Sequence, residues 1–208
     1  MKEADTESRI LDAARRVFIK RGTAGARMQE IAAEAGVNQA LLHYYFGSKD
    51  ALAERVFAEV AGTLVRSLTP IASANSTLEE SVERFVTSYI DTVRHTPFLP
   101  GYLLAEAHQN PERLSGLMKK AIGVVPAQGA AALLARIEGI IAERVAAGSM
   151  RPIAARQLLV NVLALTVMPF VARPLLGAVL GMDDHTFDEF LDERRRELPG
   201  FILNALQS

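Results

Sequence analysis

Apolar residues recur every three or four positions along almost the whole chain, the spacing that places them on one face of an α-helix. The apolar face of the first such helix comprises Ile10, Leu11, Ala14, Val17 and Phe18. Breaks in the pattern coincide with glycine, proline and runs of small polar residues, and no stretch shows the two-residue alternation of a half-buried β-strand. The pattern therefore predicts an all-α protein.

Glycine divides the first third of the chain into short helices. The predicted helices are a first one that ends at Gly22, followed by helices at about 28–35, 39–46 and 48–66. Gly36 follows the second helix, at the position where a left-handed backbone conformation is common and favours glycine. Gly47 ends the third helix, and Ser48 is a good N-cap for the fourth. Two short helices joined by a glycine turn are thus expected to pack on a longer first helix.

The rest of the chain is predicted to be helical at about 77–94, 102–108, 111–121, 127–147, 153–180 and 186–206, with a small polar connection at 67–76. Two capping boxes are expected, one formed by Thr77 with Glu80 and one by Thr186 with Glu189. Pro199, which Gly200 follows, lies inside the last apolar stripe, so a kink or break is expected there.

The most apolar segment is 157–172, and it is shorter than the roughly 20 residues of a membrane-spanning helix. It contains Asn161, Thr166 and Pro169, so we predict a helix buried by protein on nearly every side and no membrane span. The N-terminus is polar and acidic and lacks the apolar run of a secretory signal, which favours a cytoplasmic protein.

Composition narrows the chemistry that the chain can perform. Half of the 208 residues are apolar, cysteine is absent, and the net charge is −1. Disulfides and cysteine metal sites are therefore excluded, and any binding of nucleic acid must come from a local arrangement of residues. No nucleophile elbow, phosphate-cradling loop or metal-ligand spacing occurs. The sequence thus predicts no enzyme, no cofactor and no metal site.

The pair of short helices has the layout of a helix-turn-helix, in which the second helix lies in the DNA major groove. In that helix Leu42 and Phe46 face inward, and the opposite face presents Gln39, Ala40, His43 and Tyr44. Glutamine can pair with adenine, alanine can meet a thymine methyl group, and Lys49 at the start of the next helix can hold a phosphate. Alternatively, His43, Tyr44 and Tyr45 are partly buried aromatics that hold a small bundle together.

The segment IAAEAGVNQALLHYYFGSKDAL resembles the second helix, turn, recognition helix and start of the fourth helix of the TetR family of bacterial transcriptional regulators. The resemblance covers about residues 8–57. It implies a DNA-binding domain at 1–47 and a larger helical domain at 48–208 that binds a small-molecule effector and dimerises, with helix 48–66 connecting the two.

The same resemblance implies the roles of single residues. Base-reading roles fall on Gln39, Ala40 and Tyr44, phosphate-holding roles on His43, Tyr45 and Lys49, and a further DNA contact on Gln29. Where the family usually opens its second helix with threonine or serine, this chain has Ala26 and Arg27, so Arg27 is a candidate phosphate contact in place of that hydroxyl. Leu41 stands where the family often has a small hydroxyl residue, and it either reads a thymine methyl group or is buried.

In the larger domain, a homodimer is expected through the helices at about 153–180 and 186–206, although these helices could instead form only the internal core. Arg194, in the last apolar stripe, either extends to solvent or forms an interface ion pair. The run 193–197 is expected to be a solvated face. Candidate ligand-binding residues, each of which could also be satisfied within the core, are Phe85, Tyr89, Thr92, Tyr102, Glu106, His108, Asn161 and Thr166.

These observations predict a transcriptional repressor that a small-molecule effector releases from a near-palindromic DNA operator. The alternative is a helix-turn-helix DNA-binding structural or partner-docking protein without an effector.

Overall fold

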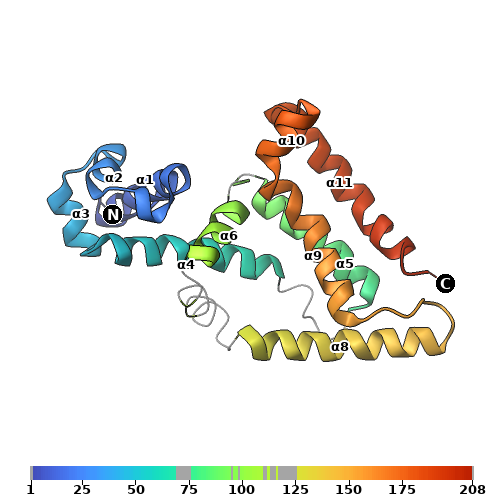
Figure 1. The fold of residues 1–208 in the computed structure, drawn as a ribbon. Helices are drawn as coiled ribbons and strands as arrows, with labels where there is room; N and C mark the ends of the chain where they lie inside the picture. The colour runs from blue at the N-terminus through green and yellow to red at the C-terminus, as the bar shows by residue number, and fades with distance from the viewer. Residues whose placement is uncertain are drawn as a thin grey trace. The chain divides into compact units, whose positions relative to one another are not determined.

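The computed structural model describes residues 2–68, 76–94, 96, 97, 99–109, 112, 116 and 126–207, without the side chains of 2–4, 60, 61, 63–68, 106, 109 and 126–129. Within these ranges the chain is helical and has no strand, as predicted. The helices in Figure 1 are α1 (Lys2–Gly25), α2 (Met28–Ala35), α3 (Gln39–Phe46), α4 (Lys49–Leu68), α5 (Leu78–Val93), α6 (Leu99–Gln109), α8 (Pro126–Ala146), α9 (Ala155–Val171), α10 (Arg173–Leu180) and α11 (Asp184–Asn204). Most of the predicted helix at 111–121 and most of the connection at 67–76 lie outside the described residues.

The chain forms two compact units, residues 1–62 with 101–123 and residues 63–100 with 124–208. The first unit is longer than the predicted DNA-binding segment 1–47, because Leu52, Val56 and Phe57 of α4 are buried within it. The division of functions at residues 47 and 48 stays a prediction.

The core of the first unit is formed by apolar residues that α1 to α4 each contribute, among them Phe18, Ile31, Leu42 and Leu52. α6 joins this unit through Tyr102, whose ring centroid lies 6.4 Å from that of Phe57 and whose hydroxyl lies 3.2 Å from Thr23 Oγ1. This packing explains why a segment distant in sequence belongs to the N-terminal unit.

Glycines end the first helices as predicted. Gly22 has φ 69° and ψ 162°, which interrupts α1 and leaves one further turn to Gly25. Gly36 has φ 64° and ψ 37°, the left-handed conformation that the end of α2 requires. Arg9 Nη2 donates a hydrogen bond of 2.7 Å to the carbonyl oxygen of Ala35, so a side chain from α1 satisfies one of the last carbonyls of α2.

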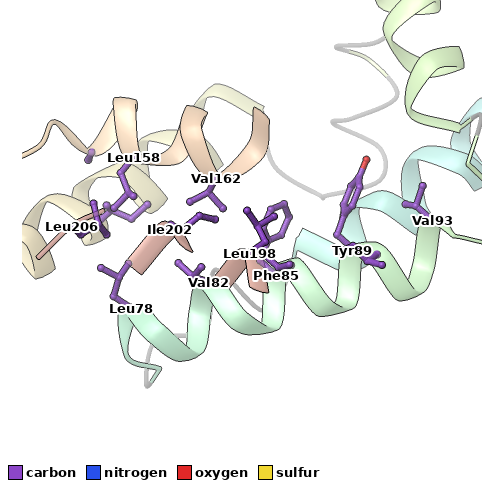
Figure 2. Packing of buried hydrophobic residues seen from close by; sticks show 14 of the residues in the cluster. Leu78, Val82, Phe85, Tyr89, Val93, Leu158, Val162, Leu198, Ile202 and Leu206 are labelled. Carbon is purple, nitrogen blue, oxygen red and sulfur yellow. The ribbon is translucent and has the colours of Figure 1, made fainter. Parts of the chain in front are cut away.

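The core of the second unit is built on α5, whose buried face contacts residues of α9 and α11 (Figure 2). The buried residues of α5 are Leu78, Ser81, Val82, Phe85, Val86, Tyr89, Ile90 and Val93. The capping box predicted at its start is confirmed, because Thr77 N donates to Glu80 Oε2 (3.1 Å) and Glu80 N donates to Thr77 Oγ1 (3.2 Å).

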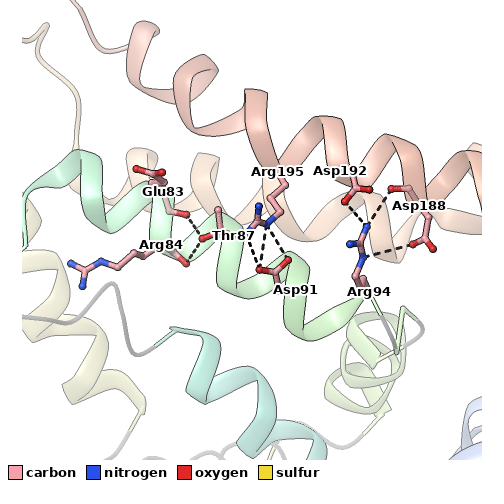
Figure 3. Close-up of polar contacts among 8 residues, drawn as sticks. All are labelled: Glu83, Arg84, Thr87, Asp91, Arg94, Asp188, Asp192 and Arg195. Atoms are coloured by element: carbon pink, nitrogen blue, oxygen red, sulfur yellow. Dashed lines mark hydrogen bonds and ion pairs between the residues drawn. The ribbon is translucent and has the colours of Figure 1, made fainter.

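Ion pairs join α5 to α11 outside this core (Figure 3). Arg94 lies 2.7 Å from a carboxylate oxygen of Asp192 and 3.8 Å from one of Asp188, and Arg195 lies 3.0 Å from one of Asp91. Arg195 is exposed, as expected for the run 193–197, and it also pairs with the neighbouring helix.

The helix expected at 153–180 is two helices, because α9 ends at Val171 and α10 turns away from it by 69°. Ala172, between them, has φ −86° and ψ 5°. Arg173 at the start of α10 donates to Asp184 (2.7 Å) and lies over the ring of Phe187, so contacts with α11 hold the turn. Among the described residues no single helix is long and apolar enough to cross a membrane, and α9 with α10 reach that length and hydropathy only as this bent pair.

The last helix also begins differently from the prediction. Asp183 is the N-cap and forms a capping box with Thr186, since Thr186 N donates to Asp183 Oδ1 and Asp183 N to Thr186 Oγ1, both at 2.8 Å. The predicted box of Thr186 with Glu189 is wrong, because Thr186 occupies the third position of the helix and not the cap. Of the kink or break expected at Pro199, the break is wrong, since α11 continues through this residue to Asn204.

One smaller boundary and one exposure differ as well. α6 begins at Leu99, three residues before its predicted start, because Pro100 fits the first turn of a helix, where no backbone donor is needed. α9 is not buried on nearly every side, since Val160 is 57% and Met168 54% exposed in the single chain.

Arg194 has a role that neither expectation included. Pro169 lacks the backbone N–H that would bond the carbonyl of Leu165 one turn earlier in α9. Arg194 of α11 donates to this carbonyl from Nε (3.1 Å) and Nη2 (2.6 Å), and burial lowers the pKa of the guanidinium. Arg194 thus satisfies a carbonyl that the proline leaves without a helical partner.

Candidate nucleic-acid interface

α3 is a short helix fixed at both ends. The side chain of Asn38 accepts a 2.7 Å hydrogen bond from Leu41 N, which caps the N-terminus, and Gly47 N donates to His43 O (2.8 Å) at the C-terminus. Leu42 is 0% exposed, and Phe46 is half-buried beside it. The helix is therefore held by its cap and by its inward residues, as a helix of eight residues requires.

The other face of α3 is open. Gln39, Ala40, His43 and Tyr44 are exposed, and the exposed fraction of Tyr44 is 77%. Tyr45 is half-buried and lies between the rings of Tyr44 (centroids 5.5 Å apart) and Phe46 (6.3 Å). The alternative of partly buried aromatics thus fits Tyr45 but not His43 or Tyr44. Leu41, which the sequence left open, is half-buried.

The side chains that are candidates for holding phosphate differ in whether they already donate hydrogen bonds within the protein. Lys49 Nζ donates to the carbonyls of Ala24 (3.1 Å) and Ala26 (3.2 Å), so it links the start of α4 to the junction of α1 and α2 and keeps one hydrogen for another acceptor. Arg27 is the exposed N-cap residue of α2 and makes no side-chain cap bond, and Gln29 is exposed in the first turn.

The ring of His43 is fixed by the turn that follows it. Its Nδ1 lies 2.7 Å from the carbonyl oxygen of Gly47, and its Nε2 lies 3.4 Å from the amide nitrogen Nε2 of Gln39. Sequence reasoning missed these contacts, and it also missed the cap formed by Asn38, although asparagine directly before an apolar helix is a usable signal.

A comparison with protein families decides what this arrangement is. Residues 10–56, which contain α2, α3 and the start of α4, match the family model described as bacterial regulatory proteins, tetR family. The segment 10–56 belongs to the TetR family. This family of regulatory proteins agrees with the prediction of a non-enzymatic protein.

Two curated relatives of this chain are HTH-type regulators. The transcriptional repressor NicS of Pseudomonas putida is 31% identical over 134 residues, which are 60% of this chain and 62% of NicS. The transcriptional regulator BetI of Rhizobium meliloti is 38% identical over 77 residues, which are 37% of this chain and 38% of BetI. The chain thus matches less than two thirds of the length of either relative.

Solved structures resemble the whole chain in fold. The ketosteroid transcriptional regulator KstR2 of Mycobacterium tuberculosis has a TM-score of 0.69 at 13% identity, covering 97% of this chain and 95% of its own. The hemolysin II transcriptional regulator HlyIIR has a TM-score of 0.58 at 21% identity, covering 99% and 98%. At these identities the likeness concerns the fold alone.

The candidate ligand residues are divided between the two units. Tyr102 and His108 belong to α6 in the first unit, and the side chain of Glu106 is outside the described residues. The remaining five are on α5 and α9, where burial differs: Phe85, Tyr89 and Thr166 are buried, Thr92 is half-buried and Asn161 is exposed. Thr166 Oγ1 donates to the carbonyl of Val162 (2.8 Å), and burial raises the pKa of the Tyr89 hydroxyl, which fits roles within the core.

Of these residues, Phe85 lines an apolar cavity of about 30 Å³ between α5, α8 and α9. Ser81 and Arg136 are the polar members of its lining. Arg136 Nη2 donates to the carbonyl of Ser76 (2.9 Å), and Ser76 Oγ lies 2.9 Å from Ser81 Oγ. A cavity of this volume holds about one or two water molecules, so a larger ligand requires the surrounding helices to move. Sequence periodicity gave no signal for Ser81 or Arg136.

Proposed function

We propose that this chain is a DNA-binding transcriptional regulator that inserts α3 into the major groove of its operator. The observation that carries the proposal is the contrast between Leu42, 0% exposed, and Tyr44, 77% exposed, on a helix of eight residues. An exposed tyrosine beside Gln39, Ala40 and His43 offers groups that suit base edges and phosphates, whereas a face that only meets solvent needs none of them.

The regulator acts as a homodimer, which would place two copies of α3 on successive turns of a near-palindromic site. Large apolar side chains on α9 and α11 support this assembly, since Val160, Met168 and Phe201 are each more than half exposed in the single chain. Surfaces of this kind are commonly covered by a partner subunit.

The regulator is a repressor that an effector releases. The effector would bind in the second unit, at the cavity between α5, α8 and α9, and favour a conformation that no longer fits the operator. The proposal of repression rather than activation is supported by the relative NicS, which is itself a transcriptional repressor.

DNA binding is tested by fluorescence anisotropy with the DNA that flanks the gene, after footprinting has located the site. Tyr44→Ala and Gln39→Ala are expected to weaken binding by about tenfold or more, without a change in melting temperature, because both side chains are exposed. Gln207→Ala, which removes an exposed glutamine from the second unit, is the matched control. Affinity should also fall steeply with salt as phosphate counterions are released. If both variants bind the operator with unchanged affinity, α3 is not the helix that contacts the DNA bases.

A second candidate is a helix-turn-helix DNA-binding structural or partner-docking protein without an effector, and the small volume of the cavity favours it. A thermal-shift screen with apolar and cationic small molecules separates the two. A compound that raises the melting temperature and also releases operator DNA supports the effector. If no compound in a broad screen does both, the second candidate is preferred.

A further inference from the structure

The hydrogen bonds of His43 determine which of its ring nitrogens carries a hydrogen. A carbonyl oxygen can only accept, so the 2.7 Å contact with Gly47 O requires the hydrogen on Nδ1. In a neutral ring Nε2 is then an acceptor, and its 3.4 Å partner must be an N–H of the Gln39 amide. The backbone closes the same turn in the opposite direction, since Gly47 N donates to His43 O. His43 is thus fixed twice to the residue that ends α3.

This arrangement orients the Gln39 side chain. Gln39 and His43 are four residues apart and lie on the same exposed face of α3. With one N–H directed to His43, the amide keeps a second N–H and its carbonyl oxygen Oε1 for other partners. Adenine is recognised in the major groove by this pair of groups, since its N7 accepts from an amide nitrogen and its N6 donates to an amide oxygen. The neighbouring amide of Asn38 is engaged in the helix cap.

We propose that His43 is a positioning residue that sets the Gln39 amide for reading one adenine in each half of the operator, and is not itself a phosphate contact. With Nδ1–H donated to Gly47 and Nε2 accepting from Gln39, the neutral ring keeps no hydrogen to donate to a phosphate. This inference rests on the proposed DNA-binding function and adds to it the origin of base specificity at one position.

The test measures base discrimination and overall affinity separately. Each adenine of the footprinted site is replaced in turn by guanine, with the complementary base changed to match, and dissociation constants are measured by anisotropy. Wild-type protein is expected to lose about 5- to 140-fold in affinity at one position per half-site, the range for a bidentate contact. Gln39→Ala should abolish this difference, which identifies the adenine.

His43→Phe keeps a ring of similar size and removes both nitrogens. It is expected to reduce the discrimination at the same adenine to a few-fold while leaving affinity for non-specific DNA unchanged. His43→Gln, whose side-chain oxygen can accept from Gln39, should restore part of the discrimination. The control is His185→Phe, which changes an exposed histidine of α11 in the second unit. Melting temperatures of all variants are compared with wild type to exclude unfolding.

The outcomes separate the two proposals. If His43→Phe weakens binding to every operator and to non-specific DNA by the same factor, His43 is a phosphate contact and the inference is overturned while DNA binding stands. Unchanged discrimination in His43→Phe overturns it as well. If the wild-type protein binds none of the DNA, the proposed function fails and the inference fails with it.

Discussion

Arg194→Met tests whether a side chain of α11 replaces the backbone donor that Pro169 removes from α9. Methionine keeps the apolar stem of arginine and removes both donors that reach the carbonyl of Leu165, at 3.1 and 2.6 Å. A hydrogen bond to a charged group contributes about 1.5–3 kcal/mol, and because Leu165 and Arg194 are only half-buried we expect a loss of about 1–2 kcal/mol in the free energy of unfolding.

The decisive measurement is the same substitution in a Pro169→Ala background. Alanine restores the N–H that can bond the Leu165 carbonyl within α9, so Arg194→Met should then cost less than about 0.5 kcal/mol. Urea unfolding followed by circular dichroism gives the four values of this cycle, at one fixed protein concentration, because association changes apparent stability. Arg196→Met, an exposed arginine of the same helix, is the control and should stay within about 0.5 kcal/mol of wild type. An equal cost of Arg194→Met in both backgrounds would refute the reasoning.

Three further predictions concern the second unit. Asp183→Ala should destabilise the protein by about 1 kcal/mol through loss of the α11 cap, whereas Glu189→Ala should have little effect; both are measured by urea unfolding. The hydrogen bond from Arg144 lowers the pKa of Glu79 below its ordinary 4.5, so this contact stabilises the fold above about pH 4.5 and its contribution is lost as the pH falls through the lowered pKa. Glu79→Gln should therefore flatten the dependence of melting temperature on pH in that acidic range. Met168→Glu should shift the sedimentation equilibrium toward monomer and Met168→Leu should not, and a dimer that survives the glutamate would exclude this face of α9 as the interface.

The sequence predicted the short helices of the first unit because the residues that end them act locally. Gly36 and Gly47 adopt positive φ, and α2 and α3, which they follow, begin and end where the pattern placed them. Thr77 similarly marks the start of α5, since both partners of its capping box lie within four residues. Signals of this kind depend on neighbouring residues and need no knowledge of the tertiary structure.

The features that the sequence could not predict depend on contacts between distant segments. The turn between α9 and α10 is held by Arg173 with Asp184 and Phe187, and the role of Arg194 follows from its place opposite Pro169 in the folded chain. Of the candidate ligand residues, Phe85 lines the cavity between α5, α8 and α9, whereas the sequence pointed to neither Ser81 nor Arg136. Helical spacing shows which residues share a face, but it does not show which buried polar groups border a cavity.

These distant contacts also indicate which helix moves if a ligand enlarges the cavity between α5, α8 and α9. α5 and α9 are both fixed to α11, the first by the ion pairs of Arg94 and Arg195 and the second by Arg194 at the Leu165 carbonyl. Moving α9 would leave that carbonyl unsatisfied, at about 1–3 kcal/mol.

α8 is held partly by contacts that are easier to exchange for water. The ion pair of Arg144 with Glu79 is about one third to one half exposed, and exposed pairs of this kind contribute up to about 1 kcal/mol. Arg136, which lines the cavity, donates a hydrogen bond to the carbonyl of Ser76. A ligand or a water molecule could take the place of this carbonyl as the acceptor. Because displacement of α8 breaks the weaker contacts, we expect ligand binding to move α8 against a block of α5, α9 and α11. The exposed face of α9 would then change its position only as a result of the movement of α8.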